Sequence, residues 1–373
     1  MKFKVSKSVL TSAIQTVEGA VATKTTLPIL SNVLIEASKD KILFNTTDLD
    51  IGIIYCAKAE VIEEGNITVP AKRFADIVRE LPEGEITITV RKNFNMIIDC
   101  DSCSFRLIGL PKEEFPTIPK FNNKENIILP QAVLKKLLKK VSFAMSRDET
   151  RYVLNGTLFM LKNKILRLVA TDGRRLALIE SALPLEINKK EVIIPIKTIN
   201  ELNKILKDEG QVKIIFSDNQ IAFELDGTTT IVSRLIEGEF PSYEQIIPKE
   251  KQKEKQEKIH IEKDRLLSAI KRASLFTSQD SQSIKLDVFK NKLVISKMTP
   301  DIGEVKEEIT MDYKGNELTV GFNPAFLMDV LKNLQNETVD FELNDAEKPG
   351  VFREVLTEEN GMYVYIVLPM QLV

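Results

Sequence analysis

Near its N-terminus the chain reads Val9-Leu10-Thr11-Ser12-Ala13-Ile14-Gln15-Thr16-Val17-Glu18-Gly19-Ala20-Val21. Its apolar residues recur at the i, i+4, i+8 spacing of an amphipathic helix. A shift of 124 residues gives seven apolar residues at the matching places, and a shift of 256 gives a looser copy in which Arg265 breaks the pattern. The apolar positions of these two copies are Val133, Leu134, Leu137, Leu138, Val141, Ala144 and Met145, then Leu266, Ala269, Ile270, Ala273 and Phe276. This internal repeat predicts three tandem copies of one unit.

A second helix is predicted in each copy, opened by a proline at the position where the first turn of a helix tolerates one. These prolines are Pro70, Pro195 and Pro324. Strand-like runs lie between and after the helices, at residues 42–48, 165–172 and 293–301 and at residues 86–90, 212–216 and 339–343. The predicted fold class is α+β, with two helices on antiparallel sheets in each unit. The predicted domains are residues 1–120, 128–248 and 259–373, and we interpret the charge run from Pro248 to Lys258 as a solvated linker.

The composition is typical of a soluble globular protein, with 43% hydrophobic and 28% charged residues in a chain of 373. No apolar run approaches the roughly 20 residues that a membrane helix needs. The N-terminus lacks the apolar core of a signal peptide. Only three cysteines occur, Cys56, Cys100 and Cys103, which favours a reducing compartment over a disulfide scaffold. We therefore expect a cytoplasmic protein with no membrane partner.

Charge is distributed unevenly, although the net charge is only −2. The six predicted helical segments are residues 6–21, 71–81, 131–147, 196–208, 262–276 and 324–335. They hold 17 basic and 8 acidic residues, so they carry +9, whereas the other 35 basic and 46 acidic residues carry −11. The densest basic cluster is Lys135, Lys136, Lys139 and Lys140, followed by Arg147, and it is predicted to lie opposite an apolar face. Helices with basic outer faces can neutralise phosphates without reading bases. Any single helix of this kind is also compatible with an ordinary solvated surface.

Residues that would form a catalytic centre are sparse. His260 is the only histidine and follows the charged linker, and the CxxC spacing of Cys100 and Cys103 has no second pair of ligands nearby. No glycine-rich phosphate loop occurs. We therefore predict no catalytic residue, no metal site and no cofactor. Two rival classes stay open, namely a metal-dependent enzyme such as a nuclease built on dispersed carboxylates, and a non-topological repeat scaffold that binds proteins.

The most specific residues of the chain are Arg151-Tyr152-Val153-Leu154-Asn155-Gly156 and Val169-Ala170-Thr171-Asp172-Gly173-Arg174-Arg175-Leu176-Ala177. They resemble the middle domain of the bacterial DNA sliding clamp, the β subunit of DNA polymerase III. Further pieces agree with this family in the expected order, namely Leu27-Pro28-Ile29-Leu30, Glu239-Phe240-Pro241-Ser242-Tyr243 and Leu368-Pro369-Met370-Gln371-Leu372. The resemblance therefore covers the whole chain.

This resemblance implies a closed ring, formed by a head-to-tail homodimer of three-domain chains with twelve helices lining the hole. It implies an accessory processivity factor of the DNA polymerase III holoenzyme, which encircles duplex DNA and has no catalytic site. The implied partners are double-stranded DNA bound without sequence preference, the replicative polymerase catalytic subunit, the clamp loader, other proteins with a clamp-binding motif, and a second copy of the chain.

The resemblance and the charge pattern together suggest three sets of functional residues. The predicted DNA-facing residues are Lys24, Lys72, Arg73, Lys135, Lys136, Lys139, Arg147 and Lys197. A groove for partner peptides is predicted to be lined by Arg151, Leu154, Thr171, Gly173, Arg174, Arg175, Leu176, Pro241, Ile246, Val367, Leu368, Pro369 and Met370. The predicted dimer interface contains Leu275, Phe276, Glu304, Glu307 and Glu308, with the glutamates facing Lys72 and Arg73.

The predicted groove has a simpler interpretation at two places. Thr171-Asp172-Gly173 is also the pattern of a plain β-turn, and the segment from Val367 to Leu372 is also that of a terminal core strand. The first unit has Thr47-Asp48-Leu49 at the equivalent place, so the Gly-Arg-Arg extension belongs to the second unit. Arg151 and Arg175 are expected to bond peptide carbonyl or acidic groups at the rim. Gln245, Gln371 and Val373 depart from the family pattern, so they bear on peptide preference.

Overall fold

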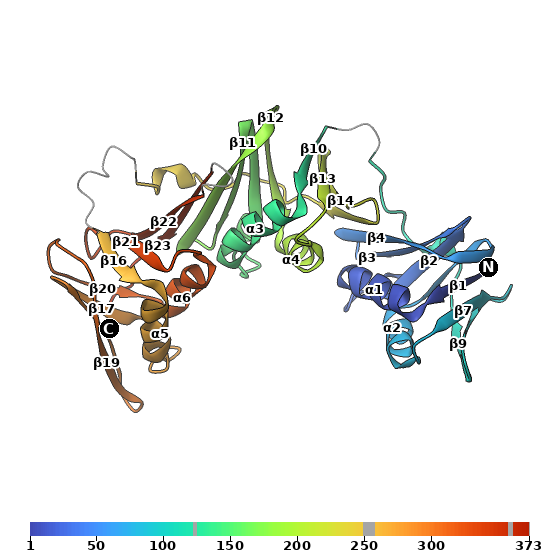
Figure 1. The fold of residues 1–373 in the computed structure, drawn as a ribbon, viewed down its shortest axis with the longest axis horizontal. Coiled ribbons are helices and arrows are strands. Elements are labelled where there is room, and N and C mark those ends of the chain that lie inside the picture. The colour runs from blue at the N-terminus through green and yellow to red at the C-terminus, as the bar shows by residue number, and fades with distance from the viewer. Residues whose placement is uncertain (122–124, 249–257, 357–360, 373) are drawn as a thin grey trace. The chain divides into compact units, whose positions relative to one another are not determined.

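The computed structural model describes residues 1–121, 125–248, 258–356 and 361–372 (Figure 1). The chain forms two compact units, one of Met1–Lys135 with Lys197–Leu235 and the other of Lys136–Ile196 with Ile236–Val373. These units do not follow the sequence repeat, because the strands of consecutive repeats pair with one another. The predicted linker residues 249–257, like residues 122–124, lie outside the described residues. The predicted boundaries 1–120, 128–248 and 259–373 stay a prediction.

The first compact unit holds two antiparallel sheets. The five-stranded sheet has the order β5 (Glu60–Glu63), β1 (Lys2–Ser6), β7 (Glu85–Val90), β8 (Asn95–Cys100), β9 (Cys103–Ile108). The eight-stranded sheet has the order β10 (Asn126–Pro130), β13 (Gln211–Phe216), β14 (Gln220–Leu225), β15 (Thr229–Arg234), β4 (Ile51–Lys58), β3 (Lys41–Thr47), β2 (Asn32–Ser38), β6 (Gly65–Pro70). Its centre is the β15–β4 pair, which joins the second repeat to the first.

The second compact unit has the corresponding arrangement. Its six-stranded sheet has the order β11 (Gly156–Thr171), β12 (Arg175–Pro195), β23 (Gly361–Val367), β22 (Gly350–Leu356), β21 (Thr338–Glu342), β16 (Lys258–Glu262). Its four-stranded sheet has the order β19 (Gly303–Thr310), β18 (Lys292–Thr299), β17 (Ile284–Phe289), β20 (Leu318–Phe322). The β12–β23 pair joins the third repeat to the second, as β4–β15 joins the second to the first.

All six predicted helical segments are confirmed. They are α1 (Lys7–Val17), α2 (Ala71–Glu80), α3 (Gln131–Val141), α4 (Ile196–Ile205), α5 (Lys263–Ser274) and α6 (Pro324–Asn333). In α1 the residues Leu10, Ala13, Ile14 and Val17 are buried, as the apolar spacing predicts. The Ser6 and Asn323 side chains accept hydrogen bonds from backbone N–H groups at the starts of α1 and α6, which otherwise lack helical partners. Among the described residues no helix is long and apolar enough to cross a membrane.

One prediction about the basic cluster is wrong. The sequence pattern predicts Lys140 on the basic outer face of α3, but its side chain is only 4% exposed and forms an ion pair with Glu354 on β22. Its ammonium group also lies 4.8 Å from the centre of the Tyr363 ring. A buried carboxylate and an aromatic face therefore compensate for the lost hydration of this charge. Lys139, its neighbour in sequence, is exposed as predicted.

Candidate functional site

The turn between β11 and β12 is built by its own polar side chains. The Thr171 hydroxyl donates to the Arg175 carbonyl at 2.6 Å and accepts from the Gly173 N–H at 3.0 Å. The Asp172 carboxylate accepts from the backbone N–H groups of Arg174 and Arg175 at 2.9 and 3.0 Å. Gly173 has φ +85°, which a residue with a Cβ rarely adopts. The β-turn interpretation is thus confirmed for the backbone.

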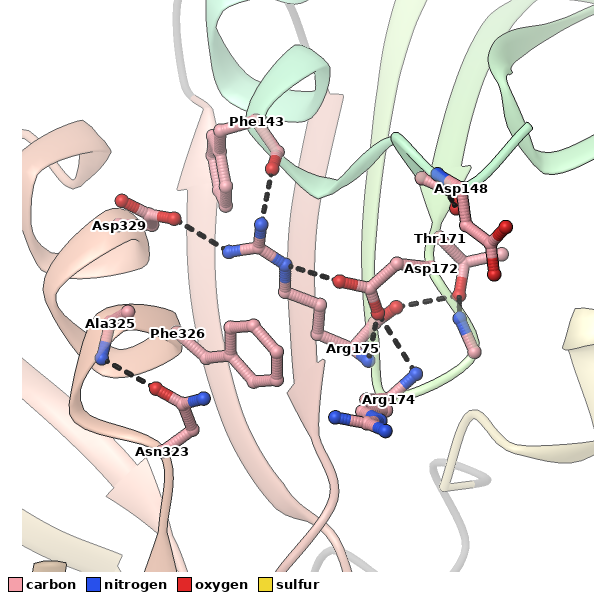
Figure 2. A network of polar contacts seen from close by, with 12 residues as sticks. Phe143, Asp148, Thr171, Asp172, Arg174, Arg175, Asn323, Ala325, Phe326 and Asp329 are labelled. Atoms are coloured by element: carbon pink, nitrogen blue, oxygen red, sulfur yellow. Dashed lines mark hydrogen bonds and ion pairs between the residues drawn. The ribbon is translucent and has the colours of Figure 1, made fainter. Parts of the chain in front are cut away.

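Arg175 lies at the centre of the polar network in Figure 2. Its guanidinium donates to the Asp172 carboxylate at 3.0 Å, to the Asp329 carboxylate at 2.6 Å and to the Phe143 carbonyl at 2.5 Å. Its charge also lies 4.4 Å from the centre of the Phe326 ring. Burial opposes the charge of Arg175, but Tyr365 and the two carboxylates outweigh it and raise the pKa of the guanidinium.

The expected role of Arg175 at the rim therefore changes. All three nitrogens of its guanidinium already donate inside the second compact unit. A peptide could recruit them only by breaking charge-assisted hydrogen bonds, which are the stronger kind. The geometry makes Arg175 a brace between the β11–β12 turn and α6, whose residues Phe326 and Asp329 receive it (Figure 2).

The other two arginines of the turn are exposed. The Arg151 guanidinium donates to the Asp172 carbonyl at 2.8 Å and lies 3.7 Å from the Asp148 carboxylate, but about half of its side chain remains exposed. Arg174 is exposed, and its carbonyl accepts from the Leu368 N–H at 2.9 Å. This hydrogen bond fixes the turn beside the C-terminal segment.

The structure brings together most of the residues predicted to line the groove, but at different depths. Arg175 pairs with Val367 in the β12–β23 register, and the Met370 N–H donates to the Gly321 carbonyl at 2.8 Å. The members that are buried are Leu154, Thr171, Leu176 and Val367. The members that reach the surface are Arg151, Gly173, Arg174, Pro241, Ile246 and Leu368, with Pro369 and Met370 half-buried. The buried members form a support beneath the surface residues that a ligand would contact.

The sequence does not predict three members of this network, Phe143, Phe326 and Asp329. Phe326 and Asp329 belong to the amphipathic helix predicted after Asn323-Pro324. Asp329 lies 154 residues after Arg175 in the chain, and no local spacing connects them. The only sequence signal for this contact is an aspartate beside the apolar face of the helix, and it does not indicate that Arg175 is the partner.

The predicted DNA-facing residues differ in their surroundings. Exposed side chains are those of Lys24, Lys72, Arg73, Lys139 and Arg147. Lys135 is partly exposed and forms an ion pair with Asp208 at 2.7 Å. Lys197 is paired with Asp48 of the first repeat, and Lys136 is half-buried. Their contact with DNA stays a prediction.

The predicted dimer-interface residues surround the end of α5 and the β18–β19 hairpin. Leu275 is 72% exposed and Phe276 is half-buried. Glu304 is exposed, whereas Glu307 accepts from Arg272 of the same chain at 2.5 and 2.8 Å. Arg272 lowers the pKa of the Glu307 carboxyl, against a smaller opposing effect of burial. Glu308 lies 3.6 Å from Lys292 and 3.8 Å from Lys306. If Glu307 also bound a basic residue of a second copy, its carboxylate would be shared between that residue and Arg272.

The residues considered for metal or redox chemistry have ordinary structural positions. Cys100 and Cys103 face each other across the tight β8–β9 turn, and burial raises the pKa of the Cys100 thiol. The Nδ1 atom of His260 lies 2.8 Å from the Oδ1 atom of Asp340, at hydrogen-bonding distance. Within the described ranges, no group of three or more His, Cys, Asp or Glu side chains is arranged to hold a metal ion.

The repeated two-helix unit, joined edge to edge through its sheets, defines a clamp-type fold. Models of the DNA polymerase III beta subunit match the chain in order: the N-terminal domain at residues 1–119, the central domain at 128–242 and the C-terminal domain at 244–371. The chain therefore belongs to the DNA polymerase III β subunit family, the bacterial sliding clamps.

Relatives and solved structures agree over the full length. The beta sliding clamp of Chlamydia pneumoniae is 35% identical, covering 100% of this chain and 99% of its own. That of Pseudomonas putida KT2440 is 32% identical over 100% of both chains. The sliding clamp of Bacillus subtilis has a TM-score of 0.93 at 31% identity, and that of Pseudomonas aeruginosa bound to griselimycin has 0.92 at 31%, each covering 100% of both chains. The chain is accordingly a sliding clamp, an accessory replication subunit rather than an enzyme.

Proposed function

We propose that two copies of this chain close head to tail into a ring around duplex DNA and tether the replicative polymerase to its template. The observation that carries this proposal is the use of equivalent strands at each repeat boundary. β4 pairs with β15, and β12 pairs with β23. The remaining equivalents are β19 and β9, and each of them is the last strand of its sheet. Pairing β19 of one copy with β9 of another would repeat the same junction twice and close a six-unit ring.

Side chains near these two open edges support the same contact. Leu275, Met298 and Ile302 are exposed around the β18–β19 hairpin, and Phe105 and Ile108 are exposed on β9. Exposed apolar residues that cluster in this way are typical of protein interfaces. An apolar cavity of about 340 Å³ between α1 and α2 is bordered by Lys72, Asp76 and Arg79, and we propose that it receives Leu275 or Phe276 of the second copy.

An ion pair inside the chain suggests a further contact across the ring. Lys197 follows Pro195 by two residues and pairs with Asp48 of the preceding repeat. Lys72 follows Pro70 by the same two residues, and the third-repeat counterpart of Asp48 is Asp301. We expect Lys72 or Arg73 to meet Asp301 of the second copy, with Glu304, Glu307 and Glu308 adding negative potential nearby.

The basic residues on and beside the helices fit a helix-lined hole through which DNA passes. Twelve helices spaced by about 9–10 Å around a circle give a diameter of about 36 Å between the axes of opposite helices. Subtracting one helix diameter of about 10 Å leaves an opening of about 26 Å. A duplex fits this opening with water around it. Lys24, Lys72, Arg73, Lys135, Lys136, Lys139, Arg147 and Lys197 would contact phosphates, which gives binding without sequence preference.

We place the partner site at the β11–β12 turn and the C-terminal segment. Ile246, Leu368 and Met370 offer apolar surface, while Arg151 and Arg174 offer exposed guanidinium groups at its margin. The proposed ligands are short segments of the polymerase catalytic subunit, the clamp loader and other proteins with a clamp-binding motif. Griselimycin, bound in the Pseudomonas aeruginosa structure, is a suitable probe for the same site.

We assign the three clamp domains to residues 1–120, 128–248 and 259–373 and place the protein in the cytoplasm, where bacterial replication occurs. The family-model boundaries at residues 119, 128, 242 and 244 support this division.

The test is retention on DNA after loading by the clamp loader. The protein is loaded on a nicked circle and challenged with high salt, before and after the circle is linearised. Retention on the circle with rapid loss after linearisation is expected, because cutting removes the topological link and leaves local contacts unchanged. Equal loss from both forms would overturn the ring and would favour a repeat scaffold that holds DNA or proteins without encirclement.

A further inference from the structure

We propose that Arg167 is a positioning residue for the partner site, which it serves by holding the segment Phe240–Ile247 against the six-stranded sheet. This inference rests on the proposed peptide site. Arg167 lies on β11, four residues before Thr171, and belongs to none of the residue sets predicted from the sequence. Its role is to fix one wall of the site, since Pro241 and Ile246 lie on the segment it holds.

The contacts of Arg167 divide between a sheet neighbour and this segment. Its Nε and Nη2 atoms reach the Glu180 carboxylate at 2.6 and 2.5 Å across the β11–β12 pair. Its Nη1 atom donates to the Tyr243 hydroxyl at 3.1 Å and to the Glu244 carboxylate at 3.3 Å. One guanidinium therefore links the sheet to two consecutive residues of the segment, and Glu180 orients it for this task.

Tyr243 transmits this link to the apolar interior. Its ring is buried in a cluster with Leu176 and Ile366, which lie on the strands that bear the partner site. Phe240 packs edge-on against the Tyr243 ring at 6.1 Å between centroids. The buried tyrosine needs a hydrogen-bond partner for its hydroxyl, and Arg167 supplies it. Ile246, three residues further on, is 47% exposed, and its N–H donates to the Tyr243 carbonyl at 3.1 Å, which ties its backbone to this anchor.

The first repeat shows that the fold itself does not require the polar link. A shift of 124 residues equates Arg167 with Leu43 and Glu180 with Cys56, and these two residues pair across β3 and β4 in the same register. The first linker reads Glu114-Phe115-Pro116-Thr117-Ile118 where the second reads Glu239-Phe240-Pro241-Ser242-Tyr243, a shift of 125 residues, so Ile118 corresponds to Tyr243. Ile118 has no hydroxyl and packs against an apolar cluster of its sheet. The first linker is therefore docked without an arginine link at this position. The second repeat adds the arginine link where the proposed partner site lies, which favours a functional reason for it.

Two variants separate positioning from simple stabilisation. Arg167→Met removes both sets of contacts. The exchange Arg167→Glu with Glu180→Arg keeps an ion pair across β11 and β12 but moves the guanidinium to β12, away from Tyr243 and Glu244. The probe is a fluorescein-labelled peptide with the clamp-binding segment of the replicative polymerase, and its dissociation constant is measured by fluorescence anisotropy. Thermal unfolding of each variant is recorded in parallel.

We expect both variants to bind the peptide about tenfold more weakly, because the wall must then be ordered when the peptide binds. We also expect Glu244→Gln, which keeps the tyrosine contact, to lose less than about threefold. Recovery of wild-type affinity in the exchange variant would overturn the proposal, since the strand ion pair alone would then explain the effect. Unchanged affinity in Arg167→Met would overturn it as well.

A separate measurement distinguishes this failure from failure of the clamp function. Among molecules already loaded, the rate of loss from the nicked circle should match that of the wild type in both Arg167 variants, because the ring edges β9 and β19 are not altered. The amount loaded should fall, since the clamp loader is proposed to bind the same site. If the wild type binds the peptide but is not retained on the circle, the ring proposal fails while the partner site stands. If the wild type does not bind the peptide at all, the partner site itself is wrong and Arg167 cannot position it.

Discussion

Lys140 and Lys139 are neighbours on α3 with opposite expected roles, and this contrast gives a stringent prediction. The Lys140 and Glu354 side chains are 4% and 3% exposed, and Glu354 also accepts from the Gln335 N–H at 3.0 Å. Lys140→Met leaves a buried carboxylate without its counter-charge. We expect this to lower the free energy of unfolding by about 3–5 kcal/mol, the usual cost of removing one partner of a buried ion pair. Urea unfolding followed by circular dichroism measures the loss.

The double variant Lys140→Met with Glu354→Gln is the matched test of this cause. It removes both charges and keeps an acceptor for Gln335, so we expect it to regain at least about 2 kcal/mol relative to the single variant. Lys139→Met should leave stability nearly unchanged and should lower the slope of log affinity for a short duplex against log salt by up to about 0.9. A loss below about 1 kcal/mol in Lys140→Met, or a double variant no better than the single one, would refute the buried-charge reasoning.

Three further changes test other parts of the molecule. Gly173→Ala places a Cβ 2.7 Å from the Arg151 guanidinium at φ +85°, so we expect about 1–2 kcal/mol of destabilisation by urea unfolding and weaker peptide binding. Leu275→Asp introduces a charge at the proposed interface, so sedimentation should show monomers and retention on circular DNA should disappear. Because Arg272 lowers the pKa of the Glu307 carboxyl, the pair stabilises the fold fully above the ordinary value of 4.5 and loses this contribution as the pH falls through the lower folded-state pKa. Glu307→Gln should flatten this part of the pH–stability curve, and an unchanged curve would contradict the assignment.

Local periodicity predicted most of the fold because each helix carries its own signal. The spacing of Leu10, Ile14 and Val17 indicates a buried face without knowledge of any partner, and α1 buries all three. Lys140 shows the limit of this reasoning. A lysine beside other lysines has the pattern of a solvated face, and only the distant residues Glu354 and Tyr363 make burial of its charge possible. The strand pairs β4–β15 and β12–β23 were equally inaccessible, because pairing between repeats leaves no trace in either strand alone.

The partner site shows the same division between what is local and what is not. Thr47 and Thr171 begin turns with the same hydrogen bonds. In each turn the threonine hydroxyl donates to the carbonyl four residues later, and the carboxylate of the aspartate that follows accepts from two backbone N–H groups. Even the link to the next repeat is shared, since the Arg234 N–H donates to Asp50 as the Leu368 N–H donates to Arg174.

The two turns therefore differ in side chains rather than in backbone. Leu49, at φ +79° and 44% exposed, stands where the second repeat has Gly173. Asp50 replaces Arg174, and Arg234 replaces Leu368. A leucine held at positive φ is strained, so the backbone of this turn suits the glycine of the second repeat better. Beside the first turn, Arg234 occupies the place that Leu368 has beside the second, so a guanidinium replaces an apolar contact surface there. Repetition thus explains why the chain has two such turns, and these three exchanges explain why we propose only the second as the place where partners bind.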